Sequence, residues 1–202
     1  GHEGDTYKTI DLAGKETTKW SWGCSHSMSN VLRYNPAVSD FMNACVTDCY
    51  PGTEGSCFET TSIGGVYLNR RQKVMDVAAG CNGSVAGELG SAALSPNGFK
   101  MVFNAHQAPT VLGQDSYDTA TMNQDIALVS VTRASTAGQV VWLTNTTSVD
   151  EMDSSIGLYQ PTGSGEQYLV GWVEGDGGVY KLAIVDAAGT LTEGPLDVTA
   201  TV

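Results

Sequence analysis

The sequence has few basic residues, no long apolar run and no segment with a helical pattern. Lys and Arg total 10 in 202 residues, against 22 Asp and Glu, which gives a formal net charge of −12. A chain this acidic is not expected to bind nucleic acid or an anionic membrane surface. No apolar run approaches the length of about 18 residues that marks a membrane span, so we expect none. No stretch of a dozen residues shows helical periodicity, which excludes a helical domain.

Several catalytic and metal-binding motifs are absent as well. The sequence has no CxxC pair and no Cys/His spacing typical of a zinc site. It has no G-x-S-x-G elbow of the kind that presents a nucleophilic serine. Its Gly-containing segments 82–84 and 87–91 precede no helix, so they form neither a P-loop nor a dinucleotide-binding turn. The sequence therefore contains no complete catalytic motif.

The cysteines indicate disulfides. All five lie in the first 81 residues, at Cys24, Cys45, Cys49, Cys57 and Cys81. Without a metal motif, disulfides in an oxidising compartment explain them best, and we expect a secreted, extracellular protein. We predict a local bridge between Cys49 and Cys57, or else between Cys45 and Cys49. Because the number is odd, one thiol is free or pairs with another chain. The start at Gly1-His2, without Met, fits a processed mature end or a remnant of cloning.

What the sequence does contain is a series of short apolar runs with a period of two. The clearest are 125–131, 140–143, 168–173 and 179–185, and turn-forming residues such as Ser95-Pro-Asn-Gly98 separate them. Alternation of this kind, in a chain with 24 Gly, is typical of sheets with frequent turns. The sequence therefore predicts an all-β fold.

These strands recur in units of four. The predicted strands are 29–34, 41–48, 65–68 and 73–78 in one unit, 90–94, 99–106, 125–132 and 139–144 in the next, and 154–160, 166–174, 179–186 and 191–199 in the last. A recurring four-stranded antiparallel unit is typical of a β-propeller. We expect one partial propeller domain over 1–202, with blades at about 25–80, 87–144 and 154–200 and a half-blade at about 6–22. The alternative is a β-sandwich.

Two segments carry a family resemblance. Residues 92–103, which contain Ser95-Pro-Asn-Gly98, resemble the S-P-D-G turn of TolB-like and WD40-like propeller repeats, where it joins the first two strands of a blade. Residues 180–189 resemble the outer hairpin of many secreted bacterial propellers. The resemblance extends over about three and a half blades and is one of repeat class, with Asn97 in place of the usual Asp and no Trp-Asp at a blade end. It implies a propeller fold and no particular activity.

The candidate site lies on the face that carries the long loops. Three residues occupy equivalent strand ends in successive units: Asp48, His106 and Glu174. His26 and Trp22 lie near a loop on the same face, and Gln107 borders the second long loop. We expect these six residues to bind a ligand, with Trp22 able to stack on a sugar. His26 and His106, with carboxylates, could hold Ca²⁺ or a transition-metal ion. The plainer alternative is that they are strand-end polar groups that hydrogen-bond loop backbone.

Three functions remain open. The first is an extracellular binding module that holds a glycan, peptide or protein on its loop face. The second is a secreted enzyme acting on polysaccharide or peptide, with a His/carboxylate or metal site at the channel mouth. The third is a structural subunit of a larger assembly.

We also expect a second polypeptide. By the strand assignment, the chain starts with the last two strands of a blade, and about three and a half blades leave sheet faces uncovered. A different chain that carries the missing strands would complete the propeller.

Overall fold

A computed structural model describes residues 7–20, 30–47, 65–68, 72–75, 87–107, 123–132 and 137–199. These residues form an all-β structure of fourteen strands without a helix. The strands are β1 (Tyr7–Ile10), β2 (Glu16–Trp20), β3 (Asn30–Asn35), β4 (Asp40–Thr47), β5 (Gly65–Leu68), β6 (Gln72–Met75), β7 (Gly87–Ser95), β8 (Gly98–His106), β9 (Gln124–Thr132), β10 (Ala137–Trp142), β11 (Glu151–Tyr159), β12 (Gln167–Glu174), β13 (Val179–Asp186) and β14 (Leu191–Val198).

The strands form antiparallel sheets in chain order. One sheet is the hairpin β1–β2, and the other three are the four-stranded sheets β3–β6, β7–β10 and β11–β14. Each predicted group of four strands therefore forms one sheet. Two first strands begin earlier than expected, β7 at Gly87 and β11 at Glu151. In each of them the pairing register shifts part-way along the strand, after Leu89 and after Met152, and this irregularity hides the alternation on which the prediction relied.

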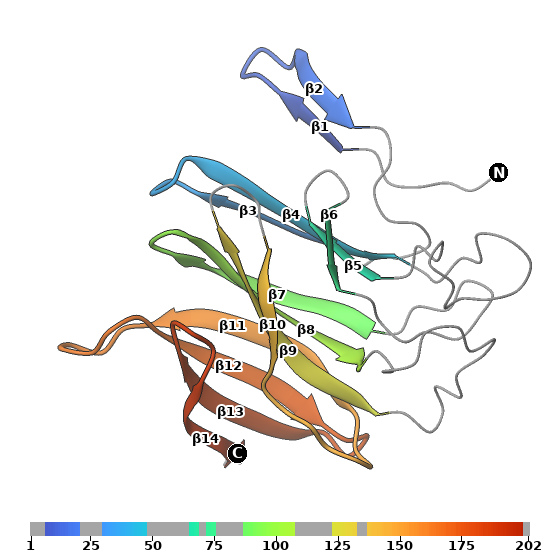
Figure 1. Cartoon of the computed structure of the whole chain (residues 1–202), viewed down its shortest axis with the longest axis vertical. Coiled ribbons are helices and arrows are strands. Elements are labelled where there is room, and N and C mark those ends of the chain that lie inside the picture. The colour runs from blue at the N-terminus through green and yellow to red at the C-terminus, as the bar shows by residue number, and fades with distance from the viewer. Residues whose placement is uncertain are drawn as a thin grey trace, which may run out of the picture.

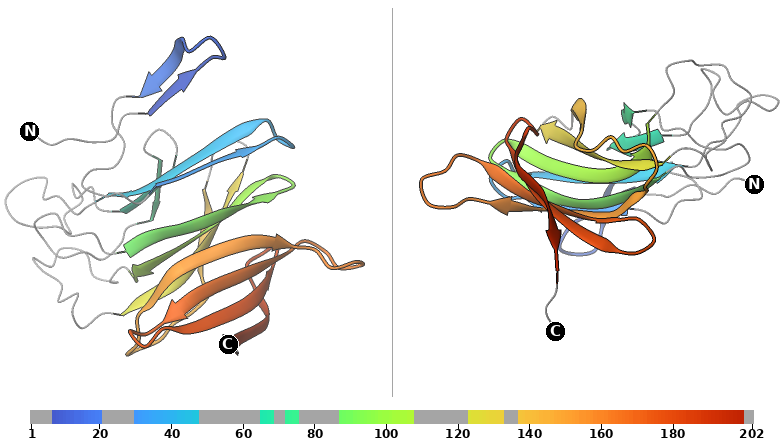
Figure 2. Two further views of the ribbon diagram at one scale, coloured as in Figure 1. Left: turned by 180° about the vertical axis from the view of Figure 1, so that it is seen from behind. Right: turned by 90° about the horizontal axis from the view of Figure 1, so that it is seen from below.

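The three four-stranded sheets stack face to face (Figures 1 and 2), with β7–β10 in the middle. β7 contacts both β3 and β11, so the first strands of the three sheets are neighbours. The stacking buries two apolar clusters, one on each face of the middle sheet. The first includes Met42 and Phe103, and the second includes Val102, Tyr168 and Trp172. Within the described part of the chain, the sheets do not close into a ring or a barrel.

Strand β8 is buried along its whole length because it is an inner strand of the middle sheet. Phe99, Met101 and Phe103 contribute to the first cluster, and Val102 on the other face contributes to the second. Since both faces are covered, a polar side chain here needs an internal partner. Lys100 Nζ donates to Ser130 Oγ at 2.6 Å and also to the Ala187 carbonyl, and burial lowers the pKa of Lys100.

Two hairpins that are far apart in the sequence close with the same turn. In β1–β2, Asp11 Oδ1 accepts hydrogen bonds from the amides two and four residues later, at 2.9 Å each. Asp186 does the same between β13 and β14, at 2.8 Å each. Gly14 and Gly189 follow at the same spacing with φ of 81° and 89°, a region that favours glycine. Hairpin β1–β2 thus resembles the last two strands of sheet β11–β14.

Candidate functional site at the loop-bearing end of the sheets

The predicted rim lies at one end of the second and third sheets. β8 ends there at His106, β9 begins at Gln124, β11 begins at Glu151 and β12 ends at Glu174. The segment 143–150 joins β10 to β11 at the same end. Two of the predicted strand-end residues, His106 and Glu174, therefore occupy the same end of neighbouring sheets.

Asp125 organises the part of this end that belongs to the second sheet. Its side chain is buried, with 3% exposure, and its carboxylate accepts three hydrogen bonds. The donors are Gln107 Nε2 at 3.0 Å, Asn123 Nδ2 at 3.3 Å and the Thr146 amide at 2.8 Å. Gln107 Nε2 also donates to Asn145 Oδ1 at 3.3 Å. The carboxylate therefore ties both ends of the β8–β9 connection to the β10–β11 connection.

Asp150 joins this network to the third sheet. Its carboxylate accepts the Gln124 amide at 2.8 Å, and its carbonyl accepts the Gly175 amide, also at 2.8 Å. Gly175 begins the tight turn between β12 and β13. The ends of two separate sheets are thus linked through one residue of the β10–β11 connection. We call this hydrogen-bonded group of residues the platform.

His106 belongs to the framework of this platform. It is buried, and its Nδ1 lies 3.0 Å from the carbonyl oxygen of Asn123. Its predicted neighbour Gln107 is half-buried and spans Asp125 and Asn145, as described above. This geometry agrees with the plainer alternative for His106, a strand-end polar group that bonds loop backbone. Three other predicted residues, His26, Asp48 and Trp22, lie outside the described residues.

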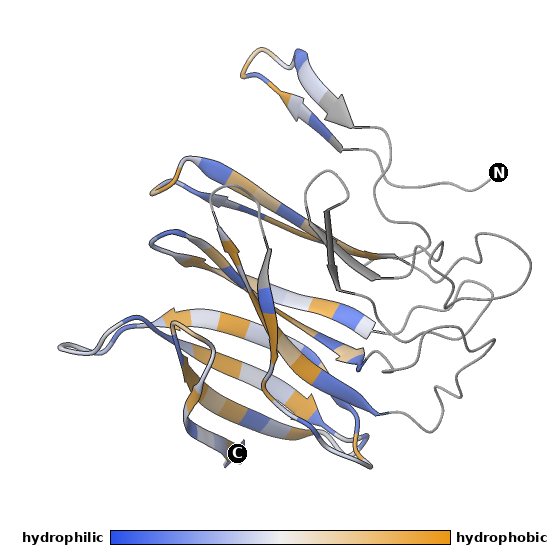
Figure 3. Ribbon diagram, viewed as in Figure 1, coloured by the Kyte–Doolittle hydropathy of each residue, from blue (hydrophilic) through white to orange (hydrophobic). Residues whose placement is uncertain are grey.

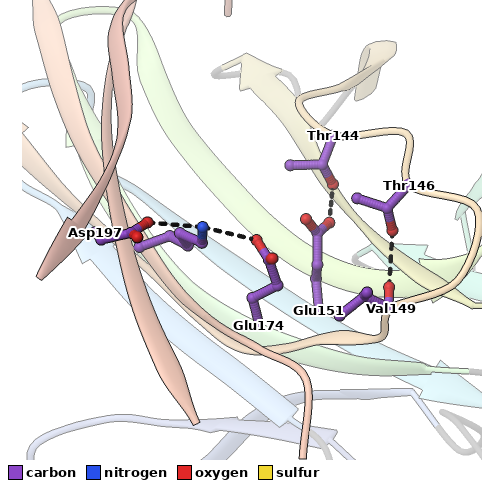
Figure 4. Close-up of polar contacts among 7 residues, drawn as sticks. Thr144, Thr146, Val149, Glu151, Glu174 and Asp197 are labelled. Carbon is purple, nitrogen blue, oxygen red and sulfur yellow. Dashed lines mark hydrogen bonds and ion pairs between the residues drawn. The ribbon is translucent and has the colours of Figure 1, made fainter. Parts of the chain in front are cut away.

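Glu151 is the most buried acid at this end. It has 1% exposure, and its carboxylate accepts a hydrogen bond from Thr144 Oγ1 (Figure 4). Burial raises the pKa of Glu151 to about 7; the Thr144 bond opposes this change, and the charges of Asp125 and Glu174 support it. Glu151 is therefore an acid that titrates near neutral pH inside the protein.

Glu174 is engaged in an ion-pair network. Its carboxylate lies 3.2 Å from Lys181 Nζ, which also lies 2.7 Å from Asp197 (Figure 4). These carboxylates, Asp197 first, raise the pKa of Lys181. The three residues come from β12, β13 and β14, so the network links the outer strands of the third sheet.

The exposed part of the platform consists of small polar groups. Asn145, Thr147, Ser148 and Asp150 are exposed along the β10–β11 connection. Amides, hydroxyls and a carboxylate of this kind form hydrogen bonds with neutral polar ligands. In the part of the chain described, no group of three His, Cys, Asp or Glu residues is arranged to hold a metal ion. The predicted metal pair His26 and His106 has one member outside that part.

Sequence reasoning missed Glu151 and Thr144. Thr144 is the last residue of the predicted strand 139–144, and Glu151 precedes the predicted strand 154–160, so neither lies inside a predicted strand. Asp153 has a φ of 53° within β11, and the strand irregularity at this point interrupts the apolar alternation. In the sequence, Glu151 stands beside Met152 in no pattern that would indicate that its side chain is buried.

Cys45 in β4 is the only cysteine among the described residues, so no disulfide joins two of them. Cys45 is buried and is itself disulfide-bonded. The predicted bridge, Cys49 with Cys57 or else Cys45 with Cys49, includes Cys49 in either form, and Cys49 lies outside the described residues. The connectivity therefore stays a prediction.

No protein-family model, curated protein or solved structure matches the chain. The described segments contain no helix that is long and apolar enough to cross a membrane.

Proposed function

We propose that this chain is an extracellular binding module of the β-propeller type, which binds a glycan at its loop-bearing end. The observation that carries the proposal is the platform itself, where buried Asp125 and exposed Asp150 hold the connections of two sheets in place. Binding sites are commonly built on loops that a rigid scaffold positions. The exposed Asn145, Thr147 and Ser148 would supply hydrogen bonds to sugar hydroxyls.

Three features support a propeller rather than a sandwich. Each four-stranded sheet follows chain order, and the first strands of the three sheets are neighbours. The middle sheet is covered on both faces, whereas a sandwich has only two sheets. The shared turn of β1–β2 and β13–β14 fits a hairpin that is the outer half of a further blade.

The chemistry of the platform favours a neutral ligand. A net charge of −12 opposes the binding of phosphorylated or sulfated ligands. The enzyme alternative gains less support, because Glu151 is buried and Glu174 is paired with Lys181. Neither carboxylate is placed to serve as the open acid or base that glycoside hydrolysis requires.

Secretion and a second polypeptide are parts of the same proposal. The disulfide at Cys45 supports an oxidising compartment. Apolar side chains exposed on the outer faces of the first and third sheets, such as Leu32 and Tyr180, support a partner that would continue the stack.

A screen of the whole chain against immobilised neutral and charged glycans tests the proposal. We expect a neutral glycan to bind, and Asn145→Ala to weaken its affinity about tenfold, as the loss of a hydrogen bond to a ligand implies. Thr162→Ala is the matched control, because Thr162 is an exposed polar residue in the turn between β11 and β12, away from the platform. Binding of no glycan, or an equal loss in both variants, would reject the proposed function.

A further inference from the structure

Glu151 lies at the base of the β10–β11 connection, the segment that carries the exposed part of the platform. The connection covers residues 143–150, and Glu151 follows it directly as the first residue of β11. Thr144, near the start of the connection, donates its hydroxyl proton to the Glu151 carboxylate (Figure 4). One hydrogen bond therefore joins the two ends of the segment that presents Asn145 and Asp150 to solvent.

Two other acidic side chains act on Glu151. Glu174 is its direct partner in the pairing of β11 with β12, and paired residues of an antiparallel sheet point to the same side. Asp125 lies in the hydrophilic start of β9 (Figure 3), and its charge also opposes the ionisation of Glu151. Lys181 Nζ lies 3.2 Å from the Glu174 carboxylate, but it is shared with Asp197 at 2.7 Å. An ionised Glu151 would therefore add a negative charge at a point that already holds two.

Further charged or titratable side chains lie on the surrounding strands and beside Glu151 in the chain. They are Glu88 of β7, Lys100 and His106 of β8, Tyr168 of β12, and Asp150 and Asp153. The acids among them are exposed, and Lys100 and Tyr168 lie near the starts of β8 and β12, at the opposite end of the sheets. His106 is buried at the same end as Glu151, so a change of charge there must be distinguished from one at Glu151.

The position of Glu151 makes its charge state matter. Its 1% exposure and, to a smaller extent, the charges of Asp125 and Glu174 raise its pKa to about 7. Below this pH the side chain is neutral and can stay in the interior. Above it the side chain is ionised, and a buried charge beside like charges is unfavourable. Because Glu151 directly follows the β10–β11 connection, it reaches water most directly when this connection moves away from the sheet ends.

We propose that Glu151 is a pH switch: its neutral form holds the β10–β11 connection against the sheet ends, and its ionisation releases the connection. Release opens the hydrogen bond from the Thr146 amide to Asp125, at 2.8 Å. It also opens the hydrogen bond from the Gln124 amide to Asp150, at 2.8 Å. As a regulation of ligand binding, the inference rests on the proposed function, because this connection carries the exposed part of the platform. Ligand affinity should then be higher at mildly acidic pH than at alkaline pH.

Amide hydrogen exchange of the whole chain, followed by NMR between pH 5.5 and pH 8, tests the switch without any ligand. The reporters are the amides of Thr146 and Gln124, and each rate is compared with the rate of an unprotected amide at the same pH. We expect their protection to fall by at least about tenfold as the pH rises, because a group with a raised pKa stabilises the closed state below that pKa and loses this effect as the pH rises through it. The fall should be the same in a low concentration of urea, since a local opening exposes little surface.

Three variants assign the change to Glu151. Glu151→Gln keeps the shape of the side chain without its charge, so the protection of both reporters should no longer depend on pH. Glu193→Gln is the matched control, because Glu193 is an exposed acid on β14, and it should keep the wild-type fall. Glu174→Gln removes one like charge beside Glu151, so it should make the fall smaller.

Several results would overturn the switch. A fall that persists in Glu151→Gln would assign the change to another group, such as His106. Constant protection in the wild type, or a fall that grows in urea as in global unfolding, would reject it as well. A glycan bound with equal affinity at pH 5.5 and pH 8 would overturn the regulation of binding. If no glycan binds, the proposed function fails, and the exchange experiment still decides the switch.

Discussion

Thr144 and Glu151 are joined by a hydrogen bond that connects two sheets. Thr144 Oγ1 accepts the amide of Ile126 in β9 at 2.8 Å and donates its own proton to the Glu151 carboxylate at the start of β11. The hydroxyl can serve both groups because it has one donor and two acceptor positions. Glu151 is thereby held in the interior even though burial opposes its ionisation.

The first prediction concerns Glu151 and pH. Its pKa is about 7 in the folded protein and 4.5 when unperturbed, so between these values the folded state retains a proton that the unfolded state releases. The free energy of unfolding should therefore fall as the pH rises from 4.5 to 7, by roughly 3 kcal/mol at about 1.4 kcal/mol per pH unit. In Glu151→Gln this contribution disappears, and the variant should be more stable than the wild type at pH 8.

Urea unfolding at pH 5 and pH 8 measures this difference. Glu193→Gln is the control, because Glu193 is an exposed acid on β14, and it should keep the pH dependence of the wild type. The same pH dependence in Glu151→Gln as in the wild type would contradict the assignment.

The second prediction concerns the close approach of β7 to β11. A Cβ atom on Gly90 would lie 2.1 Å from the carbonyl oxygen of Ser154, so Gly90→Ala forces the two strands apart. We expect a loss of about 1–3 kcal/mol in the free energy of unfolding. Gly157→Ala in β11 is the control, since a Cβ there meets nothing within 4 Å. Chemical denaturation of both variants measures the difference, and equal stabilities would refute the proposed contact.

The third prediction concerns Asn35, which links the first two sheets. Asn35 is 1% exposed, and its Nδ2 donates to the carbonyl oxygens of Ser95 at 2.8 Å and Gly98 at 2.6 Å. These carbonyls flank the turn between β7 and β8. Asn35→Asp keeps the shape of the side chain but removes both N–H donors. It should therefore lower the free energy of unfolding by about 2–3 kcal/mol. Wild-type stability in Asn35→Asp, measured at neutral pH by calorimetry, would show that these bonds contribute little.

The strands were predictable because their signals are local. Residues 179–186 form β13 as predicted, and residues 65–68 form β5, since alternating side chains and adjacent turn residues determine where such strands begin and end. Ser95 pairs with Gly98 across the two-residue turn Pro96-Asn97, as the Ser-Pro-Asn-Gly motif indicates. The all-β class follows from the same signals.

The candidate site was predictable only in outline. The strand-end positions of His106 and Glu174 follow from the order of the strands, and both lie at the loop-bearing end. Their partners do not follow from that order. Lys181 pairs with Glu174 because β12 and β13 are neighbours in a particular register, and a shift of one residue would place Lys181 on the other face.

The sequence by itself determined the all-β class, the grouping of strands into fours and the turns between them. These depend on the period of the side chains and on backbone preferences within a few residues. Only the tertiary structure decided that Glu151 is buried, which raises its pKa to about 7, and that Tyr180 and Leu196 are exposed. The sequence alone suggests the reverse, an acid in solvent and apolar residues in a core. Burial depends on which sheet faces stack against each other, and that is a property of residues distant in sequence.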